Sequence, residues 1–551
     1  MIQTKLLSSL DKCFPDENLT RHTPVKKLSV LKNQRFSLQF AFVETDLLGP
    51  HRRWVKVAVD GAPGRVEVRL TENVPSAMPL YPGRGGDENY LRLTPGLYPD
   101  LLRPLSVEGS VPLLAGQLRT AWIDVFPEGS FAPGEHTVSV SLVVGEETVG
   151  TQSLALTVID ADLPANELYV TQWFHCDCLA DYYGVKVFSE RHWEIMENFA
   201  RTAVAEGINL ILTPIFTPPL DTHIGGERPT VQLVGVRLDG DEYSFDFSLL
   251  DRFIDMCDRV GIRYFEISHL FSQWGAYHTP KIVATVNGRK KKLFGWQTDA
   301  TGEAYTAFLH AFLPAFLNHM KARGDDKRCL FHISDEPNAE QLEQYRASKA
   351  IVADLLRDYT IMDALSSFDF FEKGVVKTPI PANNHIEPFL RAQVPGLWTY
   401  YCCGQTVGVS NRLFAMPGAR TRCIGLQFFK YDIVGFLQWG YNFYYNQGSY
   451  DMVNPFLDST GEYFFPSGDG YSVYPAPDGT AWESMRLLQF REALEDTAAM
   501  KLAASFVGKD EVVRAVEAQV GEIRFDRCLS TPEQMLRARE AVNAIIRDHV
   551  K

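Results

Sequence analysis

The chain of 551 residues is too long for one small domain and favours two to four domains. Its hydrophobic content of 45 % and charged content of 22 % are ordinary for a soluble globular protein. The net charge of −14 argues against a basic face that binds nucleic acid. The one basic run, residues 289–292, follows Asn287-Gly288 and is typical of a polar hairpin turn, not of a phosphate site.

Nine cysteines occur, mostly inside apolar runs and never as a CxxC pair. Cys176 and Cys178 have the wrong spacing for a zinc site, so we expect buried free thiols in a reducing compartment. The first twenty residues lack the apolar core of a secretory signal, and no stretch approaches about 18 uninterrupted apolar residues. These features predict a cytoplasmic protein that has neither nucleic-acid nor membrane partners.

Residues 1–163 contain short runs in which apolar and polar residues alternate, such as 37–45 and 136–144. Turn formers separate these runs, for example at residues 61–64 and 133–134. The pattern predicts an N-terminal β-sandwich. We expect this domain to serve packing or substrate positioning and to carry no chemistry.

From residue 164 the pattern changes to apolar strand-like runs that alternate with helical stretches. The predicted strands cover residues 168–174, 208–216, 262–271, 329–334, 359–365, 375–383, 396–404 and 435–442. Residues 419–435 suit either a strand or a helix, and only a helix supplies the crossover before the last strand. Eight strands separated by helices predict a (β/α)8 TIM-like barrel over residues 164–500.

The C-terminal end of the chain shows helical spacing over residues 481–506 and 530–550. Ser530-Thr531-Pro532-Glu533 is a good helix start signal. The first helix is expected to complete the outer ring of the barrel, and residues 501–551 to form a short helical appendage. The predicted fold is therefore multidomain, a β-sandwich followed by an α/β barrel and a helical tail.

Two adjacent carboxylates, Asp335 and Glu336, follow the fourth predicted strand of the barrel. Barrel enzymes place their chemistry at the carboxyl ends of the strands. Adjacent residues of a strand point to opposite sides, but the chain bends before Pro337, so both side chains can face the mouth. Two close carboxylates also push their pKa values apart, which leaves one acid and one anion.

A purely structural interpretation of the same residues is a helix start. Asp335 or Asn338 would cap the helix after Pro337, and Glu336 would favour its dipole. A pair of acidic residues alone does not decide between the two interpretations.

The other strand ends carry aromatic and hydrogen-bonding residues. The candidates for substrate binding are His175, Asp177, His269, Trp274, Asn383, Trp398, Tyr400, Trp439, Asn442 and, from a later loop, Asp469. Each of them alone is more often structural. Together they supply what a sugar needs, aromatic faces for its C–H groups and polar partners for its hydroxyls, and so they indicate a glycoside hydrolase.

The motifs "WFHCDCLADYYG", "LFSQWGAYHTPKI", "HISDEP", "GFLQWGYNFYYN" and "GDGYSVYP" occur in this order over roughly residues 165 to 500. Together they resemble the catalytic domain of glycoside hydrolase family 123, also described as domain of unknown function 4091. The resemblance implies a retaining exo-acting β-N-acetylgalactosaminidase that needs no cofactor. It implies that Glu336 is the general acid/base and that Asp335 holds the 2-acetamido group, which attacks the anomeric carbon and forms an oxazolinium intermediate.

Three alternatives remain open. The substrate could be another β-glycoside, such as a β-N-acetylglucosaminide, or the barrel could bind carbohydrate without turnover. A metal-dependent hydrolase with His175, Asp177 and His269 as ligands is disfavoured, because no strand pairs two histidines at metal spacing. A cytoplasmic exo-enzyme would act on short oligosaccharides or glycosides with a terminal amino sugar. The family includes exported members, so the cytoplasmic location expected here is a departure that argues against a polymeric substrate.

Overall fold

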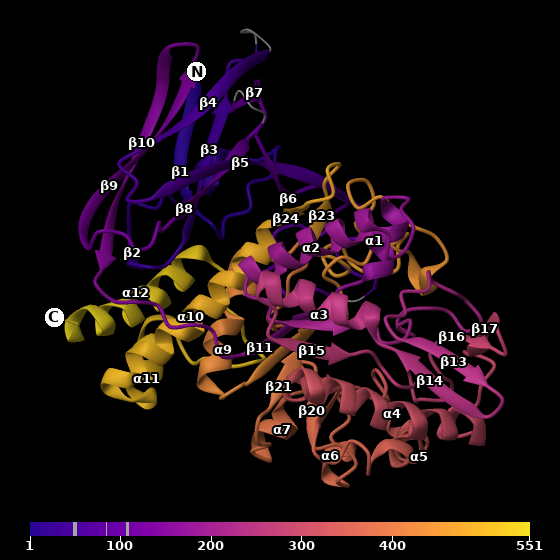
Figure 1. The fold of residues 1–551 in the computed structure, drawn as a ribbon. Coiled ribbons are helices and arrows are strands. Elements are labelled where there is room, and N and C mark those ends of the chain that lie inside the picture. Colours follow the sequence, from indigo (N-terminus) through magenta and orange to yellow (C-terminus); the bar gives the residue numbers. More distant parts are fainter. Residues whose placement is uncertain (48–51, 84, 106–108, 551) are drawn as a thin grey trace.

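The computed structural model describes residues 1–47, 52–83, 85–105 and 109–550. A β-rich N-terminal region leads into a sheet of eight parallel strands, and helices end the chain (Figure 1). The expected multidomain order of a β region, an α/β region and C-terminal helices is confirmed. The boundaries at residues 163 and 500 stay predictions, and helix α10 (Met485–Val507) runs through residue 500 without a break.

The N-terminal region consists of two five-stranded sheets. Their strands are β1 (Ile2–Ser8), β2 (Lys27–Leu31), β3 (Phe36–Glu44), β4 (Arg52–Asp60), β5 (Arg65–Ser76), β6 (Gly96–Pro104), β7 (Ser110–Leu114), β8 (Arg119–Phe126), β9 (Gly134–Val144) and β10 (Glu147–Ile159). One sheet has the order β1-β3-β8-β5-β6 and the other β2-β10-β9-β4-β7. Alternating residues of both sheets, such as Phe40 and Val140, bury their side chains in one shared core.

The second region is built on eight parallel strands, and each coincides with a strand predicted from the sequence. They are β11 (Tyr169–Gln172), β12 (Leu210–Thr213), β15 (Tyr264–Ile267), β18 (Cys329–Phe331), β19 (Thr360–Ala364), β20 (Thr378–Ile380), β21 (Trp398–Tyr400) and β22 (Gly435–Gln438). Neighbours along the chain are neighbours in the sheet, and β22 pairs with β11. Between β20 and β21 the described backbone makes a single parallel bridge, Ala382 with Tyr400, so the strands form a near-barrel.

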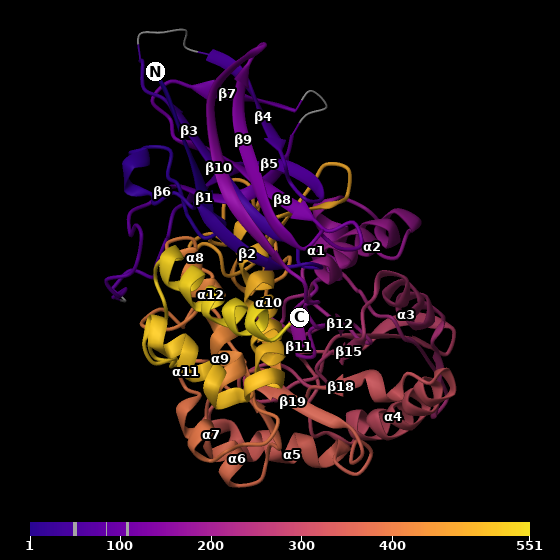
Figure 2. The same ribbon diagram turned by 90° about the vertical axis from the view of Figure 1, so that its left-hand side faces the viewer.

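Helices surround these strands (Figure 2). They are α1 (Cys176–Tyr182), α2 (Glu190–Ala205), α3 (Ser248–Val260), α4 (Glu303–Arg323), α5 (Leu342–Val352), α6 (Asp369–Glu372), α7 (Glu387–Arg391), α8 (Gly418–Arg422) and α9 (Ile424–Lys430). Ser189 caps α2 by accepting a hydrogen bond from the amide of His192. The ambiguous segment 419–435 is helical up to Lys430, in α8 and α9, as the crossover required, and its last residue begins β22.

Two insertions after β12 and β15 form a small separate sheet. Its strands are β13 (Gly235–Asp239), β14 (Glu242–Asp246), β16 (Ile282–Val286) and β17 (Arg289–Phe294). The turn between β16 and β17 is at Asn287-Gly288, where both residues have positive φ. The basic run lies on β17 itself, so the prediction that it forms the turn is wrong by a few residues.

Three helices end the chain, α10, α11 (Lys509–Val520) and α12 (Pro532–His549). Thr531 and Gln534 form a capping box at the start of α12, and Pro532 occupies its first turn. Helix α12 packs against β2 and β10, and α10 packs against β6. The yellow helices therefore lie beside both the β-rich region and the near-barrel (Figure 2).

Buried charges also join the N-terminal region to the rest of the chain. Arg486 of α10 donates to both carboxylate oxygens of Asp100, at 2.7 and 2.8 Å, and Tyr474 donates to Oδ2 of the same residue at 2.5 Å. Tyr474 lies on β23 (Val473–Pro475), which pairs with β24 (Ala481–Glu483). Further along the same face, the hydroxyls of Ser76 and Ser467 are 2.7 Å apart.

All nine cysteines lie in the described part of the chain, and none forms a disulfide. Seven are buried, as expected, whereas Cys402 and Cys403 are only half-buried. Among the described helices, none is both long enough and apolar enough to cross a membrane.

Candidate active site

A pocket opens at the carboxyl ends of the parallel strands. Its described lining residues are Trp173, His175, Leu220, Asp221, Gln273, Trp274, Asp335, Glu336, Ala364, Tyr400, Cys402, Cys403, Leu437, Trp439, Phe464 and Phe465. The pair Asp335-Glu336 is therefore inside the pocket. Six of the predicted residues line it in all, these two together with His175, Trp274, Tyr400 and Trp439.

The acidic pair leaves β18 through a short bend that hydrogen bonds hold. The amide of Glu336 donates to the carbonyl of Ala364 at 2.9 Å, and the amide of Trp274 donates to the carbonyl of Asp335 at 2.8 Å. Glu336 has a φ of 41° and Trp274 a φ of 56°. Both values lie in the left-handed region, which residues other than glycine rarely adopt. Such strained backbone is held only where the surroundings fix it, and it concentrates at functional sites.

The helical turn after Pro337 begins at Asn338. Asn338, not Asp335, is the N-cap of the turn that precedes α5, and it forms a capping box with Gln341. The capping task is thus met downstream, and the carboxylates of Asp335 and Glu336 remain available to the pocket.

The environment of the pair favours protonation. Burial, together with the neighbouring Glu336 carboxylate, raises the pKa of Asp335 well above its usual value. Burial also raises the pKa of Glu336, while the hydroxyl of Tyr400 opposes this by donating a hydrogen bond to Oε1 at 2.5 Å. Both raised pKa values favour a proton on the pair, which an acid catalyst must hold.

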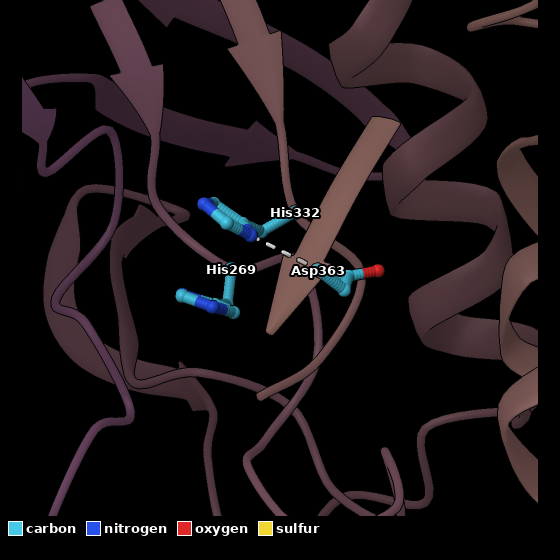
Figure 3. Close-up of side chains that lie close together, drawn as sticks. All are labelled: His269, His332 and Asp363. Carbon is cyan, nitrogen blue, oxygen red and sulfur yellow. Dashed lines mark hydrogen bonds and ion pairs between the residues drawn. The ribbon is translucent and has the colours of Figure 1, made fainter. Parts of the chain in front are cut away.

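A buried ionic layer, made of His332, Asp363 and Glu266, lies close enough to Asp335 to affect its pKa, and Figure 3 shows His332 and Asp363. The ring nitrogens of His332 face two carboxylates, Nδ1 at 3.1 Å from Asp363 and Nε2 at 2.7 Å from Glu266. Burial disfavours the charged ring, but the two carboxylates prevail and raise the pKa of His332 to about 9. His332 is thus an imidazolium at neutral pH, and its charge lowers the pKa of Asp335 against the stronger effect of burial.

His269 lies parallel to His332 rather than in the pocket (Figure 3). The ring centroids are 4.2 Å apart with an interplanar angle of 18°, and neither nitrogen of His269 has a hydrogen-bond partner. Burial and the His332 charge lower the pKa of His269 well below its usual value, so this ring is neutral.

His269, His332 and Asp363 form the one described group whose donor atoms are close enough for a shared metal ion, within 4.8 Å of one another. Two observations disfavour a metal there. Both nitrogens of His332 are occupied by carboxylates, and a protonated imidazole cannot ligate. The stacked rings also direct their lone pairs along parallel planes instead of toward one point.

The metal set of His175, Asp177 and His269, which the sequence disfavoured, is not among the described groups whose donor atoms come together. Arg228 instead neutralises Asp177, with nitrogen–oxygen distances of 2.6 and 2.7 Å, and donates to Nδ1 of His175 at 3.2 Å. Nε2 of His175 is 2.9 Å from the carbonyl of Trp439. His175 therefore contributes a ring edge to the pocket, and Asp177 lies behind it as the partner of a buried arginine.

Three further candidates do not line the pocket, and the side chains of two of them, Asn442 and Asp469, hold residues that do. Asn442 binds both the amide and the carbonyl of His175, at 2.9 and 3.1 Å. Asp469 accepts a hydrogen bond from the indole of Trp439 at 2.8 Å and so fixes that ring at the pocket. Asn383 donates to the carbonyl of Ser410 at 2.7 Å.

Trp398 is the first residue of β21, and Tyr400 is the third. Side chains two residues apart on a strand point to the same side and differ in height by about 7 Å. Tyr400 therefore reaches the pocket, while Trp398 lies one layer lower in the core and stacks on Tyr169 at 5.3 Å. With Asp177, His269, Asn383, Asn442 and Asp469, it makes six candidates that do not line the pocket.

Some lining residues had no sequence signal that we used. Asp221 follows β12, and the loop after that strand carries no motif beyond Pro218-Pro219. Phe464 and Phe465 come from a long irregular loop with no periodic pattern. A search for acidic residues in the loops that follow the predicted strands would have identified Asp221.

Asp221 is a third carboxyl group of the pocket. Burial raises its pKa to about 7, and its Oδ2 is buried without a hydrogen-bond partner. Its φ is 45°, and its amide donates to Oε1 of Gln273 at 2.6 Å while its carbonyl accepts from Ser449 at 2.8 Å. The carboxyl is thus fixed in place without being satisfied, as a group that awaits a ligand would be.

A solved structure shares the fold of this chain. A structure of a family 123 glycoside hydrolase from Clostridium perfringens, solved in a study of glycolipid glycan hydrolysis, matches with a TM-score of 0.74 and 13 % identity. The match covers 99 % of this chain and 98 % of that chain, and at this identity it shows a shared fold. A family 39 glycoside hydrolase from Bacteroides cellulosilyticus follows with a TM-score of 0.32, 10 % identity, and 89 % and 82 % coverage.

Among curated protein sequences, no match to this chain was found. The family model described as "Glycoside hydrolase 123, catalytic domain" matches residues 173–503, which is more than half of the chain. This range contains every residue of the pocket. The chain belongs to glycoside hydrolase family 123.

Proposed function

We propose that the protein is a retaining exo-glycosidase that releases terminal β-linked N-acetylgalactosamine from oligosaccharides or glycosides. The observation that carries the proposal is that Asp335 and Glu336 are adjacent in sequence and both line one aromatic pocket. Six aromatic side chains are among its described lining residues, and rings of this kind stack on the C–H faces of sugars.

The adjacency argues for a nucleophile that comes from the substrate. In the usual retaining mechanism two carboxyl groups face each other across the sugar, about 5 Å apart, and one of them attacks. Two neighbouring residues on one strand end lie on the same side of the sugar and do not flank the bond. They can instead serve two neighbouring groups of the substrate, its 2-acetamido group and its leaving oxygen.

In this mechanism Glu336 is the general acid. It gives its proton to the glycosidic oxygen as the C–O bond breaks, while the acetamido carbonyl oxygen bonds to the anomeric carbon and forms the oxazolinium ring. Glu336, now ionised, then takes a proton from the water that opens the ring, so the configuration is retained.

Asp335 has the complementary task of an anion. Its carboxylate accepts the acetamide N–H, orients the carbonyl oxygen toward the anomeric carbon and stabilises the positive charge that develops on the ring. In the free protein Asp335 and Glu336 compete for a proton. Binding of the N–H donor favours the ionised Asp335, which leaves the proton on Glu336, where it is needed.

The choice of sugar is tested directly by release of 4-nitrophenol from the β-N-acetylgalactosaminide, the β-N-acetylglucosaminide and the β-galactoside. We expect turnover of the β-N-acetylgalactosaminide. Asp335→Asn is expected to lose about 10²- to 10³-fold in kcat/KM. Asp354→Asn, an isosteric change at a side chain that is 91 % exposed, is the matched control and should keep wild-type activity.

Participation of the acetamido group has its own test. Successive fluorination of the acetyl methyl group makes the carbonyl oxygen a poorer nucleophile. We expect kcat to fall with each fluorine in the wild type. A rate that does not depend on fluorination would mean that the substrate does not supply the nucleophile.

A second candidate function rests on Asp221. A third carboxyl in the pocket could act as an enzyme nucleophile with Glu336 as the acid, which would suit β-glycosides without an acetamido group. Its pKa of about 7 leaves much of it protonated at neutral pH, and a protonated carboxyl is no nucleophile. Turnover of 4-nitrophenyl β-galactoside that Asp221→Asn abolishes would favour this candidate, and binding without any product release would indicate a non-catalytic barrel.

A further inference from the structure

A second hollow adjoins the pocket. Its described lining residues are Asp221, Thr222, His223, Trp274, Asn446, Gln447, Gly448, Tyr450, Gly461, Glu462 and Phe464. We call it the outer groove. It shares Asp221, Trp274 and Phe464 with the pocket, so the two hollows lie side by side.

We propose that the outer groove binds the part of the substrate beyond the scissile bond, and that it selects an uncharged sugar with an apolar ring face. This inference rests on the proposed function, because the pocket must hold the terminal sugar. It adds which residues read the leaving group and what chemical class they accept.

Two aromatic rings in the groove face solvent. Tyr450 is 64 % exposed and Trp274 is 50 % exposed, which is unusual for large rings that pack only for stability. Tyr450 stacks on His223 with centroids 3.7 Å apart and an interplanar angle of 10°. Nδ1 of His223 is hydrogen-bonded to the carbonyl of Gly448 at 2.7 Å, so both rings of the stack have a fixed orientation.

The backbone beneath these rings is strained and tied to the pocket. Gly448 and Ser449 both have positive φ, of 67° and 55°. The hydroxyl of Ser449 donates to the backbone carbonyl of Asp221 at 2.8 Å, which connects the segment that carries Tyr450 to the backbone of a pocket residue. A ring held in advance binds a flat partner at little cost in conformational entropy.

The charge of the groove decides which leaving groups fit. Its described lining contains the carboxyl groups of Asp221 and Glu462 and no lysine or arginine. Asn446 donates to Glu462 at 2.6 Å and holds that carboxylate at the groove. Carboxylates accept hydrogen bonds from sugar hydroxyls, whereas they repel a sulfate or a sialic acid carboxylate.

The experiment compares kcat/KM on three substrates that share a terminal β-N-acetylgalactosamine: the methyl glycoside, a neutral trisaccharide and its sulfated analogue. The wild type should prefer the neutral trisaccharide over the sulfated one by about tenfold or more. Tyr450→Ala should lose about tenfold on the trisaccharide and clearly less on the methyl glycoside. Glu462→Gln should narrow the preference against sulfate.

Tyr463→Ala is the matched control, because Tyr463 is 70 % exposed on the same loop but does not line the groove. It should change neither ratio. Equal losses by Tyr450→Ala on both neutral substrates, or wild-type indifference to sulfate, would overturn the groove assignment while turnover itself persisted. Absence of turnover on all three substrates would overturn the proposed function, and the groove assignment would fall with it.

Discussion

The hydroxyl of Tyr400 donates a hydrogen bond to Oε1 of Glu336 at 2.5 Å, across the pocket from one strand end to another. The bond stabilises the ionised carboxylate and so works against the burial that raises the pKa of Glu336. Tyr400 therefore adjusts the pH at which the proposed acid keeps its proton.

Removal of this bond is expected to move the alkaline limb of the pH profile upward. In Tyr400→Phe the carboxylate of Glu336 loses a donor, its pKa rises further, and the protonated acid survives to higher pH. The measurement is kcat/KM against pH on a substrate with a poor leaving group. Tyr401→Phe is the control, since the Tyr401 ring packs on Phe436 outside the pocket lining, and a limb that stays fixed or moves down in Tyr400→Phe contradicts the assignment.

The buried imidazolium of His332 predicts a pH dependence of stability. Its folded pKa of about 9 lies above the ordinary value of 6.5. The stabilisation it provides is complete below about pH 6.5 and is lost as the pH rises through 9. The free energy of unfolding of the wild type should therefore decline over this window.

His332→Gln should destabilise the protein by about 3–5 kcal/mol at pH 6, because Asp363 and Glu266 lose the charge between them. Denaturant unfolding at pH 6 and pH 9 measures both effects. His269→Phe is the comparison, since neither nitrogen of His269 has a partner to lose. A larger loss in His269→Phe than in His332→Gln would contradict the ionic layer.

The buried carboxyl of Asp221 is expected to lower the stability of the protein while it serves activity. Its folded pKa of about 7 lies above the ordinary 3.8, so the free energy of unfolding should fall as the pH rises from about 4 to 7, and the loss is complete above pH 7. Asp221→Asn should raise stability by about 1–3 kcal/mol at pH 8, less at pH 5, and reduce kcat/KM on oligosaccharides.

Thermal unfolding at the two pH values checks this prediction. Asp469→Asn provides the contrast, because the Asp469 carboxylate has hydrogen-bond donors in Trp439 and Gln438. Burial also raises the pKa of Asp469, to about 6, but Asp469→Asn disturbs both of these hydrogen bonds, so that variant should gain less stability at pH 8 than Asp221→Asn. If Asp221→Asn were destabilising at pH 8, its carboxyl would have a partner that outweighs the cost of burial.

Removal of metal ions is expected to leave activity unchanged. The group His269, His332 and Asp363 has its donor atoms within 4.8 Å, but carboxylates already occupy both nitrogens of His332. Dialysis against a chelator, followed by assay on the nitrophenyl substrate, measures this. Activity that is lost and then restored by added Zn²⁺ would reassign the group as a metal centre.

The eight strands could be predicted because each is a short apolar run of its own. The helices α8 and α9 could be predicted because a parallel strand pair needs a crossover, not because of their own sequence. The acidic pair could be predicted for the same topological reason, since it directly follows a strand.

The height of a side chain along a strand could not be predicted in the same way. Trp398 and Tyr400 share one side of β21, but only the structure shows that the strand ends at Tyr400 and that Trp398 lies a layer below the pocket. Nor does sequence show partners far apart in the chain. The sequence suggests that Asp177 binds substrate, but in the structure Arg228, 51 residues later, neutralises it.

The hydroxyl contact between Ser76 and Ser467 joins the N-terminal region to the loop that carries the pocket residues Phe464 and Phe465. The amide of Ser467 also donates to the carbonyl of Met78 at 3.0 Å. One wall of the pocket is thus held in shape by residues outside the matched catalytic range. The catalytic domain is consequently a poor unit for transplantation, and a chimaera that exchanges the β-rich region would alter the active site without changing a residue in it.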